Sequence, residues 1–229
     1  MQQAPPDQIW LSAPHLTGQE AAALQTALAS NWVAPVGPDV DALEREIAAW
    51  AGTEAALAVN SGTAAIHLGL RVLGVQPGDE VVVPALSYIA TVNPVRYLGA
   101  EPVFADCELD DYGMDPEWLA TAIRDRIKKG TKVRAIVAAH LFGQPAQIAA
   151  IAQVARDFHL PLLEDAAEAL GAREDGQMVG SFGQLGVYSF NGNKVVNASA
   201  GGALVGPADL IARARKLATQ AQEEAGYYL

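Results

Sequence analysis

One lysine lies within a stretch of small and polar residues. The stretch reads YSFNGNKVVNASAGG from Tyr188 to Gly202, and it holds the only lysine between Lys132 and Lys216. Small and polar residues on both sides of Lys194 are typical of a loop held close to another part of the molecule or to a ligand. A lysine in such a loop is either an ordinary solvated cation or a reactive amine. Its own neighbours leave both interpretations open.

A second group with chemical potential is the tripeptide Ser61, Gly62 and Thr63, between a predicted strand and a predicted helix. Free N–H groups and the helix dipole at the start of a helix favour an anion, and the two hydroxyl groups add donors. The pattern therefore suits a phosphate. Plain N-capping of the helix explains the same residues, so the tripeptide alone allows both.

A third candidate is Asp165, which ends the apolar segment LPLLED (160–165). Its carboxylate is expected at the rim of a buried sheet, where an ionised group needs a partner. A protonated pyridine nitrogen would be such a partner. The alternative is a helix cap, a common role for an Asp after a strand. Glu168, three residues further on, either completes a capping box or faces the same crevice.

The elements that must position these residues alternate in type along the chain. Apolar segments bounded by turn residues predict strands at 55–59, 80–84, 101–106, 133–140, 160–165, 186–190 and 202–206. Helical patterns with start and stop signals predict helices at 17–30, 40–50, 63–74, 116–128 and 147–158, and one after residue 206. The alternation predicts an α/β fold with a mostly parallel, buried sheet flanked by helices.

Ligands bind to such sheets at the carboxyl ends of the strands. Five loops follow predicted strands and are expected to meet there, namely 60–63, 84–88, 140–144, 164–168 and 189–194. Together they bring a lysine, a strand-end carboxylate, a phosphate-type helix start and the aromatic ring of Tyr88. This combination suits pyridoxal phosphate, because lysine forms a Schiff base with its aldehyde and a carboxylate keeps its ring nitrogen protonated.

Spacing excludes other cofactor sites. The P-loop GxxxxGK[ST] does not fit, because Gly186 and Gly192 are one residue too far apart and Asn193 separates Gly192 from Lys194. No GxGxxG follows the first strand, so the Rossmann fingerprint is absent. Cys107 is the only cysteine and the four histidines match no common ligand spacing, which predicts no metal.

The composition bounds the class of protein. The chain has 229 residues, 51% hydrophobic and 18% charged, enough for one large domain with a substantial core. A net charge of -11 argues against a nucleic-acid surface, and the basic residues of 124–134 are predicted to be a solvated helix end and loop. There is no run of about eighteen apolar residues and no signal-peptide pattern. We therefore expect a soluble cytoplasmic protein without nucleic-acid or membrane partners.

The sequence resembles the DegT/DnrJ/EryC1/StrS family of pyridoxal phosphate-dependent sugar aminotransferases, which have the aspartate aminotransferase type I fold. The matching segments follow in order along nearly the whole chain: SNWVAPVGPDVDALE, NSGTAAIHLGL, GDEVVVPALSYIATVNPV, HLFGQPA, LLEDAAEALGA and YSFNGNK. The resemblance implies that Lys194 forms the Schiff base with the cofactor. It also implies that Asp165 pairs with the pyridinium nitrogen and that Tyr88 stacks on the cofactor ring.

The remaining cofactor contacts are carried over in the same way. Gly62, Thr63 and Ser189 match the phosphate contacts of the family, with Ser61 beside them. Glu168 takes a position near the ring hydroxyl that varies among members. The family fold thus implies one site for the whole cofactor.

The resemblance also implies a reaction and its partners. Glutamate would leave its amino group on the cofactor, and the cofactor would pass it to a keto group of a nucleotide-linked sugar, with Lys194 moving protons as acid and base. The wording of SFNGNK and HLFGQPA is closest to the branch that aminates C4 of UDP-4-keto-6-deoxy-N-acetylglucosamine. Members of the family are homodimers, so we expect one here.

Two departures from the family pattern stand out. Members continue into a smaller carboxyl-terminal domain, whereas this sequence ends at AQEEAGYYL. We expect residues 1–229 to form the large domain, with a helical arm over about 1–35 and without the small domain. A folded domain that dimerises or binds without catalysis is the alternative. At 197–200 relatives usually have threonines and a glycine, and a positive φ at Ala200 would be strained.

Overall fold

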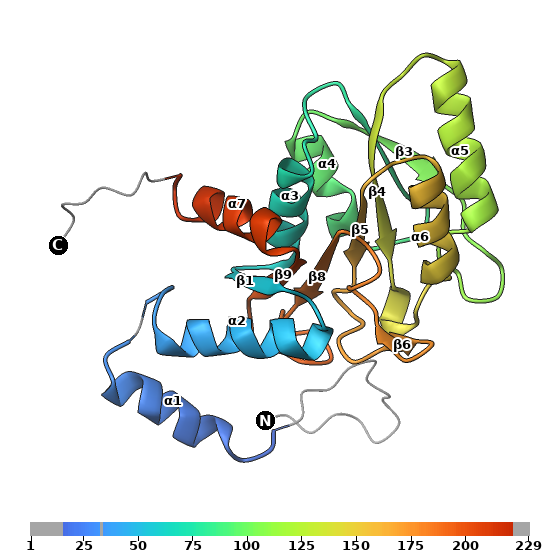
Figure 1. Ribbon diagram of the computed structural model, residues 1–229. Coiled ribbons are helices and arrows are strands. Elements are labelled where there is room, and N and C mark those ends of the chain that lie inside the picture. The colour runs from blue at the N-terminus through green and yellow to red at the C-terminus, as the bar shows by residue number, and fades with distance from the viewer. Residues whose placement is uncertain (1–15, 33, 222–229) are drawn as a thin grey trace.

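A seven-stranded sheet forms the centre of the protein (Figure 1). The computed structural model describes residues 16–32 and 34–221. The strand order is β1-β9-β8-β5-β4-β2-β3, with bounds β1 Ala55–Val59, β2 Glu80–Pro84, β3 Glu101–Ala105, β4 Val133–Ala139, β5 Leu162–Asp165, β8 Leu185–Ser189 and β9 Gly202–Gly206. β9 is antiparallel to β1 and β8, and the other pairs are parallel. The predicted α/β fold with a mostly parallel sheet is confirmed.

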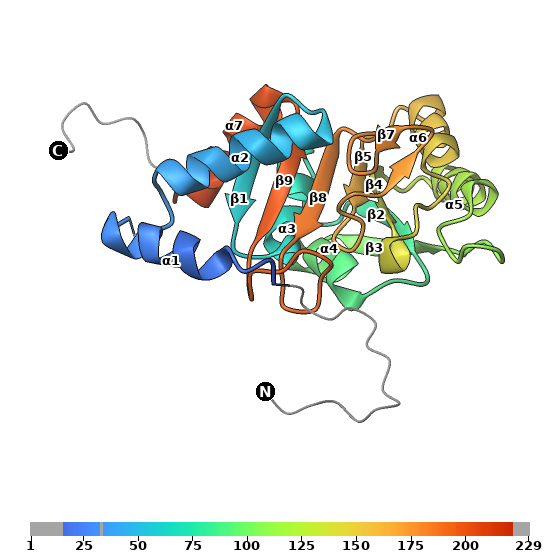
Figure 2. The same ribbon diagram turned by 90° about the horizontal axis from the view of Figure 1, so that it is seen from below.

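Helices cover both faces of this sheet. One layer holds α2 (Pro38–Ala51), α5 (Pro116–Lys128) and α6 (Ile148–Asp157), and the other holds α3 (Gly62–Val72), α4 (Asn93–Tyr97) and α7 (Ala208–Ala218). Figure 2 shows the strands side by side, with α2 at the β1 end and α5 and α6 toward the β3 end. The periodic patterns did not predict the short helices η1 (Ile89–Thr91), α4 and η2 (Leu141–Gly143) or the hairpin of β6 (Arg173–Glu174) and β7 (Gln177–Met178).

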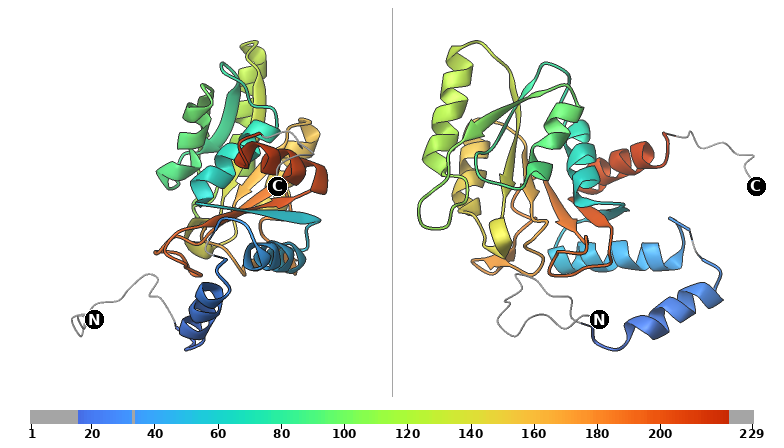
Figure 3. Two further views of the ribbon diagram at one scale, coloured as in Figure 1. Left: turned by 90° about the vertical axis from the view of Figure 1, so that its left-hand side faces the viewer. Right: turned by 180° about the vertical axis from the view of Figure 1, so that it is seen from behind.

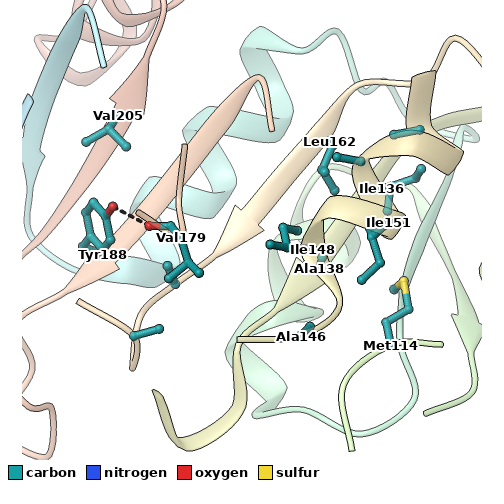
Figure 4. Close-up of a cluster of buried hydrophobic side chains, with 14 of the residues drawn as sticks. Met114, Ile136, Ala138, Ala146, Ile148, Ile151, Leu162, Val179, Tyr188 and Val205 are labelled. Carbon is teal, nitrogen blue, oxygen red and sulfur yellow. Dashed lines mark hydrogen bonds between the residues drawn. The ribbon is translucent and has the colours of Figure 1, made fainter. Parts of the chain in front are cut away.

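Two hydrophobic cores lie on the two faces of the sheet. Successive strand residues point to opposite faces, so Val82 packs in the core beneath α2, α5 and α6, whereas Val81 and Val83 pack beneath α3, α4 and α7. Figure 4 shows the first core, where the buried Tyr188 hydroxyl donates a hydrogen bond to the Val179 carbonyl at 2.7 Å. Apolar residues on both faces explain why the strands read as continuous hydrophobic runs.

Helix boundaries follow local signals in most places. Asp115 caps α5, because its side chain accepts from the N–H groups of Glu117 and Trp118 at 2.6 and 3.2 Å, and α2 ends at Gly52 with φ 72°. The predicted start of the first helix at residue 17 is wrong by three residues. Glu20 accepts from Thr17 N at 2.7 Å, but the helix α1 (Glu20–Ala29) has Gln19 as its N-cap, so only half of the capping box forms.

The helix α1 stands apart from the layered body (Figure 3). None of its ten residues is buried, and Leu24 and Leu28, one turn apart, are 66% and 67% exposed. The sheet therefore does not bury this apolar face of the helix. Among the residues that the structure describes, no helix has both the length and the apolar character to cross a membrane.

Close backbone approach at Gly186 on β8 leads to a stability prediction. A Cβ at this position would lie well inside van der Waals contact of the Gly180 carbonyl oxygen, which is backbone and cannot rotate away. We expect Gly186→Ala to lower the free energy of unfolding by about 3 kcal/mol, as overpacking does, measured by urea denaturation. Gly192→Ala is the control, because nothing lies within 4 Å of its added Cβ. Equal stability of both variants would contradict the packing described.

Candidate active site

The five predicted loops meet in one pocket of about 180 Å³ at the carboxyl ends of the strands. It is lined by every candidate from the sequence, namely Ser61, Gly62, Thr63, Tyr88, Asp165, Glu168, Ser189 and Lys194. Residues 200–201, which precede β9, complete the lining. Segments more than 130 residues apart in the chain thus face one cavity, as the rule for strand ends in parallel sheets requires.

Lys194 is a buried amine and not a solvated cation. Its residue is 8% exposed, and its backbone N–H donates to the Asn191 carbonyl at 2.9 Å, which closes a tight turn after β8. The side chain then reaches into the pocket, where Nζ donates to Glu168 Oε1 at 2.8 Å and lies 5.7 Å from the centroid of the Tyr88 ring. The amine is therefore held between a carboxylate and an aromatic face.

Asp165 occupies the same pocket from the end of β5. Its Oδ2 accepts from the Thr91 hydroxyl at 2.6 Å and its Oδ1 from the Ala167 N–H at 3.2 Å. Burial raises the pKa of this carboxyl group above its ordinary value, although both hydrogen bonds and the nearby Lys194 act in the opposite direction. The element that follows β5 is a turn and then β6, so the helix-cap interpretation of Asp165 is wrong.

The third part of the pocket is the start of α3. Ser61 Oγ accepts from the Ala64 N–H at 3.1 Å, so the predicted N-cap is present. The first-turn N–H groups of Gly62 and Thr63 have no acceptor within the helix. A Cβ at Gly62 would lie 3.0 Å from Ser189 Cβ, so the glycine is what lets the Ser189 side chain approach the helix start. The backbone N–H groups at the start of α3 and the hydroxyl group of Ser189 therefore lie close together in the pocket.

These three parts fit pyridoxal phosphate. A helix start with nearby hydroxyl groups suits the phosphate, and the buried amine suits the aldehyde. The carboxyl group of Asp165, whose ionisation burial opposes, suits a cationic ring nitrogen as counter-ion. Glu168 and Tyr88 border the same cavity. In the described part of the chain, no group of three or more His, Cys, Asp or Glu side chains is arranged to hold a metal ion.

The loop after Lys194 adopts a conformation that the sequence did not indicate. Left-handed backbone occurs at Ser199, with φ 65°, and at Gly201, with φ 119°, but not at Ala200. The strain expected from the methyl group of Ala200 therefore does not arise there. Gly201 takes the φ that suits glycine.

Sequence reasoning missed the residues that hold Asp165 in place. Thr91, which donates to Asp165, lies 74 residues earlier in the chain on η1. Its hydroxyl oxygen is 2.7 Å from that of Ser87, so a short hydroxyl chain leads from the loop after β2 to the carboxylate. The only signal in the sequence is the spacing of two hydroxyl residues by four, which is common on any helix turn.

A second hidden feature is a buried pair on the opposite face of β5. Glu164 and His140 have fully buried side chains, and His140 Nε2 lies 3.2 Å from Glu164 Oε2. Ala146 N–H donates to His140 Nδ1 at 3.1 Å, so we assign the proton of the neutral ring to Nε2. Glu164 also accepts from Gly180 and Gly183 N–H groups at 2.7 and 2.5 Å. The pair joins the ends of β4 and β5 to the loop 179–183.

The raised pKa of Asp165 predicts a variant that gains stability. Between the ordinary and the raised pKa the folded state holds more protons than the unfolded state, so this carboxyl group lowers stability as the pH rises. Asp165→Asn is expected to raise the free energy of unfolding at neutral pH, with a difference that shrinks in acid. Its amide nitrogen can donate to Thr91 Oγ1 while Thr91 donates to Ser87. Urea denaturation of both proteins at neutral and at acid pH measures this difference in the free energy of unfolding. An Asp165→Asn variant less stable than the unmodified chain at neutral pH would contradict the prediction.

Comparison with known proteins places the chain. The sequence model of the DegT/DnrJ/EryC1/StrS aminotransferase family matches residues 14–227. The chain is 44% identical over 221 residues to a protein of Bacillus subtilis named "Putative pyridoxal phosphate-dependent aminotransferase EpsN", covering 96% of this chain and 57% of that one. It is 38% identical over 216 residues to a GDP-perosamine synthase of Caulobacter vibrioides, covering 94% and 57%.

A solved structure agrees with these relatives. The crystal structure of a DegT DnrJ EryC1 StrS aminotransferase from Brucella abortus matches with a TM-score of 0.86 and 34% identity, over 91% of this chain and 56% of that one. The chain thus spans a little more than half the length of the proteins it matches. Aminotransferases of this family depend on pyridoxal phosphate, which is the cofactor that the pocket fits. The chain belongs to the DegT/DnrJ/EryC1/StrS aminotransferase family.

Proposed function

We propose that this chain forms the cofactor-binding part of an aminotransferase that transfers an amino group to a keto group of a nucleotide-linked sugar. The observation that carries the proposal is the buried amine of Lys194, held inside the strand-end pocket at 2.8 Å from Glu168. Bound pyridoxal phosphate would supply an aldehyde carbon that takes up the amino nitrogen, with the carbonyl oxygen leaving as water, and a ring that accepts electrons. The remaining chemistry belongs to the side chains of this pocket.

Each side chain has a role that its position supports. Lys194 would hold the cofactor covalently, and its amine, when free, would move protons beside the reacting carbon. Asp165 keeps the ring nitrogen protonated, because a cationic partner offsets the cost of its own buried charge. Ser189 and the start of α3 bind the phosphate. Tyr88 would cover one face of the ring, and Glu168 would lie beside the ring hydroxyl.

The substrates are proposed from the relatives and from local sequence. The family is one of aminotransferases, and the GDP-perosamine synthase relative is named for a nucleotide-linked sugar. The segments SFNGNK and HLFGQPA resemble the branch that acts on UDP-4-keto-6-deoxy-N-acetylhexosamines, so we take such a sugar as the amino acceptor. Glutamate is the proposed amino donor. Release of more than one equivalent of 2-oxoglutarate per chain only when both are supplied would test this pair of substrates.

Chemical trapping tests the cofactor site directly. The purified chain is incubated with pyridoxal phosphate, reduced with borohydride and digested for mass spectrometry. We expect a pyridoxyl group on Lys194, because its amine is in the pocket, and none on Lys132, whose side chain is 64% exposed and lies outside it. Lys194→Ala should abolish the adduct. A folded protein without any adduct at Lys194 would overturn the proposal and favour a domain that dimerises or binds without catalysis.

We also propose that the chain pairs with a second copy through α1. A helix of ten residues is marginal in water without packing, and α1 has no buried residue. Its only charged residue is Glu20, so the face with Leu24 and Leu28 offers apolar area without charge repulsion. Leu43 and Trp50 on the neighbouring α2 are also partly exposed, at 41% and 44%. Two copies of this surface would cover one another.

Charge introduced on this surface should separate the copies. The double variant Leu24→Asp/Leu28→Asp is expected to shift the chain from dimer to monomer, because association would bury two unpaired carboxylates. Size-exclusion chromatography with light scattering measures the mass. Gln25→Asp adds one charge of the same sign beside this face and should leave the mass of a dimer. A monomeric unmodified chain, or an unchanged mass in the double variant, would contradict the proposal.

A further inference from the structure

The rim of the pocket contains a turn that adopts a strained conformation. In η2 the backbone of Phe142 has φ 52° and ψ 23°, and Gly143 follows with φ 85°. A left-handed conformation is unfavourable for a residue with a Cβ. The side chain of Phe142 is 73% exposed, so burial of the ring does little to offset that cost. Another interaction must hold the turn.

That interaction comes from Glu168. Its Oε2 accepts from the Phe142 N–H at 3.0 Å, and its Oε1 accepts from Lys194 Nζ at 2.8 Å. The turn also lies against the backbone of the same residue, since a Cβ at Gly143 would be 3.1 Å from the Glu168 carbonyl oxygen. One carboxylate therefore holds both the reactive amine and the strained rim.

We propose that Glu168 is a positioning residue that couples the state of the Lys194 amine to the shape of the pocket rim. The inference rests on the proposed function for the role of that amine. Condensation of the amine with an aldehyde removes two of its three ammonium hydrogens, which leave with the carbonyl oxygen as water. Oε1 then loses donors, and the Glu168 carboxylate is free to shift. A shift of the carboxylate moves the η2 turn that it holds through the Phe142 N–H. Because Leu141 of this turn lines the pocket, the pocket wall moves with the turn.

The coupling depends on the number of acceptors. An ammonium group and a backbone N–H are donors only, and a carboxylate has two oxygens to serve them. Glutamine has the same shape but a single oxygen, and its NH₂ group would face one of the two donors. With Lys194 present, Glu168→Gln must therefore leave one donor unpaired. With Lys194 replaced by alanine, one donor remains and the single oxygen of glutamine is enough.

A double-mutant cycle on the chain without added cofactor tests whether the number of acceptor oxygens at residue 168 couples Lys194 to the rim turn. Hydrogen exchange of the Phe142 amide is measured by NMR in the unmodified chain, Glu168→Gln, Lys194→Ala and the double variant. Loss of one hydrogen bond predicts exchange about tenfold faster in Glu168→Gln. The same substitution in the Lys194→Ala background should change exchange by less than about twofold, because the coupling is then absent.

Glu174→Gln is the matched control. Its carboxylate likewise accepts from two donors, the backbone N–H groups of Ile148 and Ala149 at 3.3 and 3.4 Å, and neither of them is Phe142 or Lys194. We expect the Phe142 amide to be unaffected there. Equal acceleration by Glu168→Gln in both backgrounds, or none in the presence of Lys194, would overturn the inference. The cycle needs no cofactor, so failure of pyridoxyl trapping at Lys194 would count against the proposed function alone.

Discussion

The carboxyl groups of Glu164 and Asp165 are adjacent in the chain, face opposite sides of the sheet and are both removed from water. A strand imposes this arrangement, because successive side chains alternate between its faces. Each group must then find partners inside the protein, since a buried polar group without them is costly. On one side Glu164 collects donors from His140, Gly180 and Gly183. On the other, Asp165 meets Thr91 and the Ala167 N–H.

These two sets of partners do different things for the fold. The donors around Glu164 fasten the loop 179–183 to the end of β5, which brings Gly180 so close to β8 that only glycine fits at Gly186. The donors around Asp165 do not remove the effect of burial, which still raises its pKa. A group left in that state is suited to receive a cation. The protein therefore supplies Glu164 with hydrogen-bond donors for its charge, whereas the neighbouring Asp165 remains suited to bind a cationic ligand.

The pocket also contains a pair of opposite charges, Lys194 and Glu168. The Lys194 side chain is nearly buried, at 9% exposure, and the Glu168 side chain is 27% exposed. The Glu168 carboxylate also binds the backbone of the rim. The helix start at Gly62 and the hydroxyl of Ser189 lie in the same cavity. Anion site, amine and carboxyl group thus converge from separate loops because parallel strands end at one edge of the sheet.

Much of this was available from the sequence by itself. Continuous apolar runs alternating with helical patterns predicted the α/β sheet, and the order of strands and loops predicted which five segments would meet. Lys194, Asp165 and the tripeptide of Ser61 were found because lysine, carboxylate and hydroxyl groups at strand ends are conspicuous in an otherwise apolar pattern. Local signals of this kind act over a few residues, so they can be recognised without knowing the fold.

Only the tertiary structure decided the partners of those residues. The bond from Thr91 to Asp165 spans 74 positions and that from Phe142 to Glu168 spans 26, and neither leaves a periodic pattern in the sequence. The left-handed backbone of Phe142 was equally hidden, because a bulky residue disfavours it locally and a distant carboxylate holds it. The sequence determined which chemical groups reach the end of the sheet. Folding determined their partners, because hydrogen bonds depend on distances that only the packed chain sets.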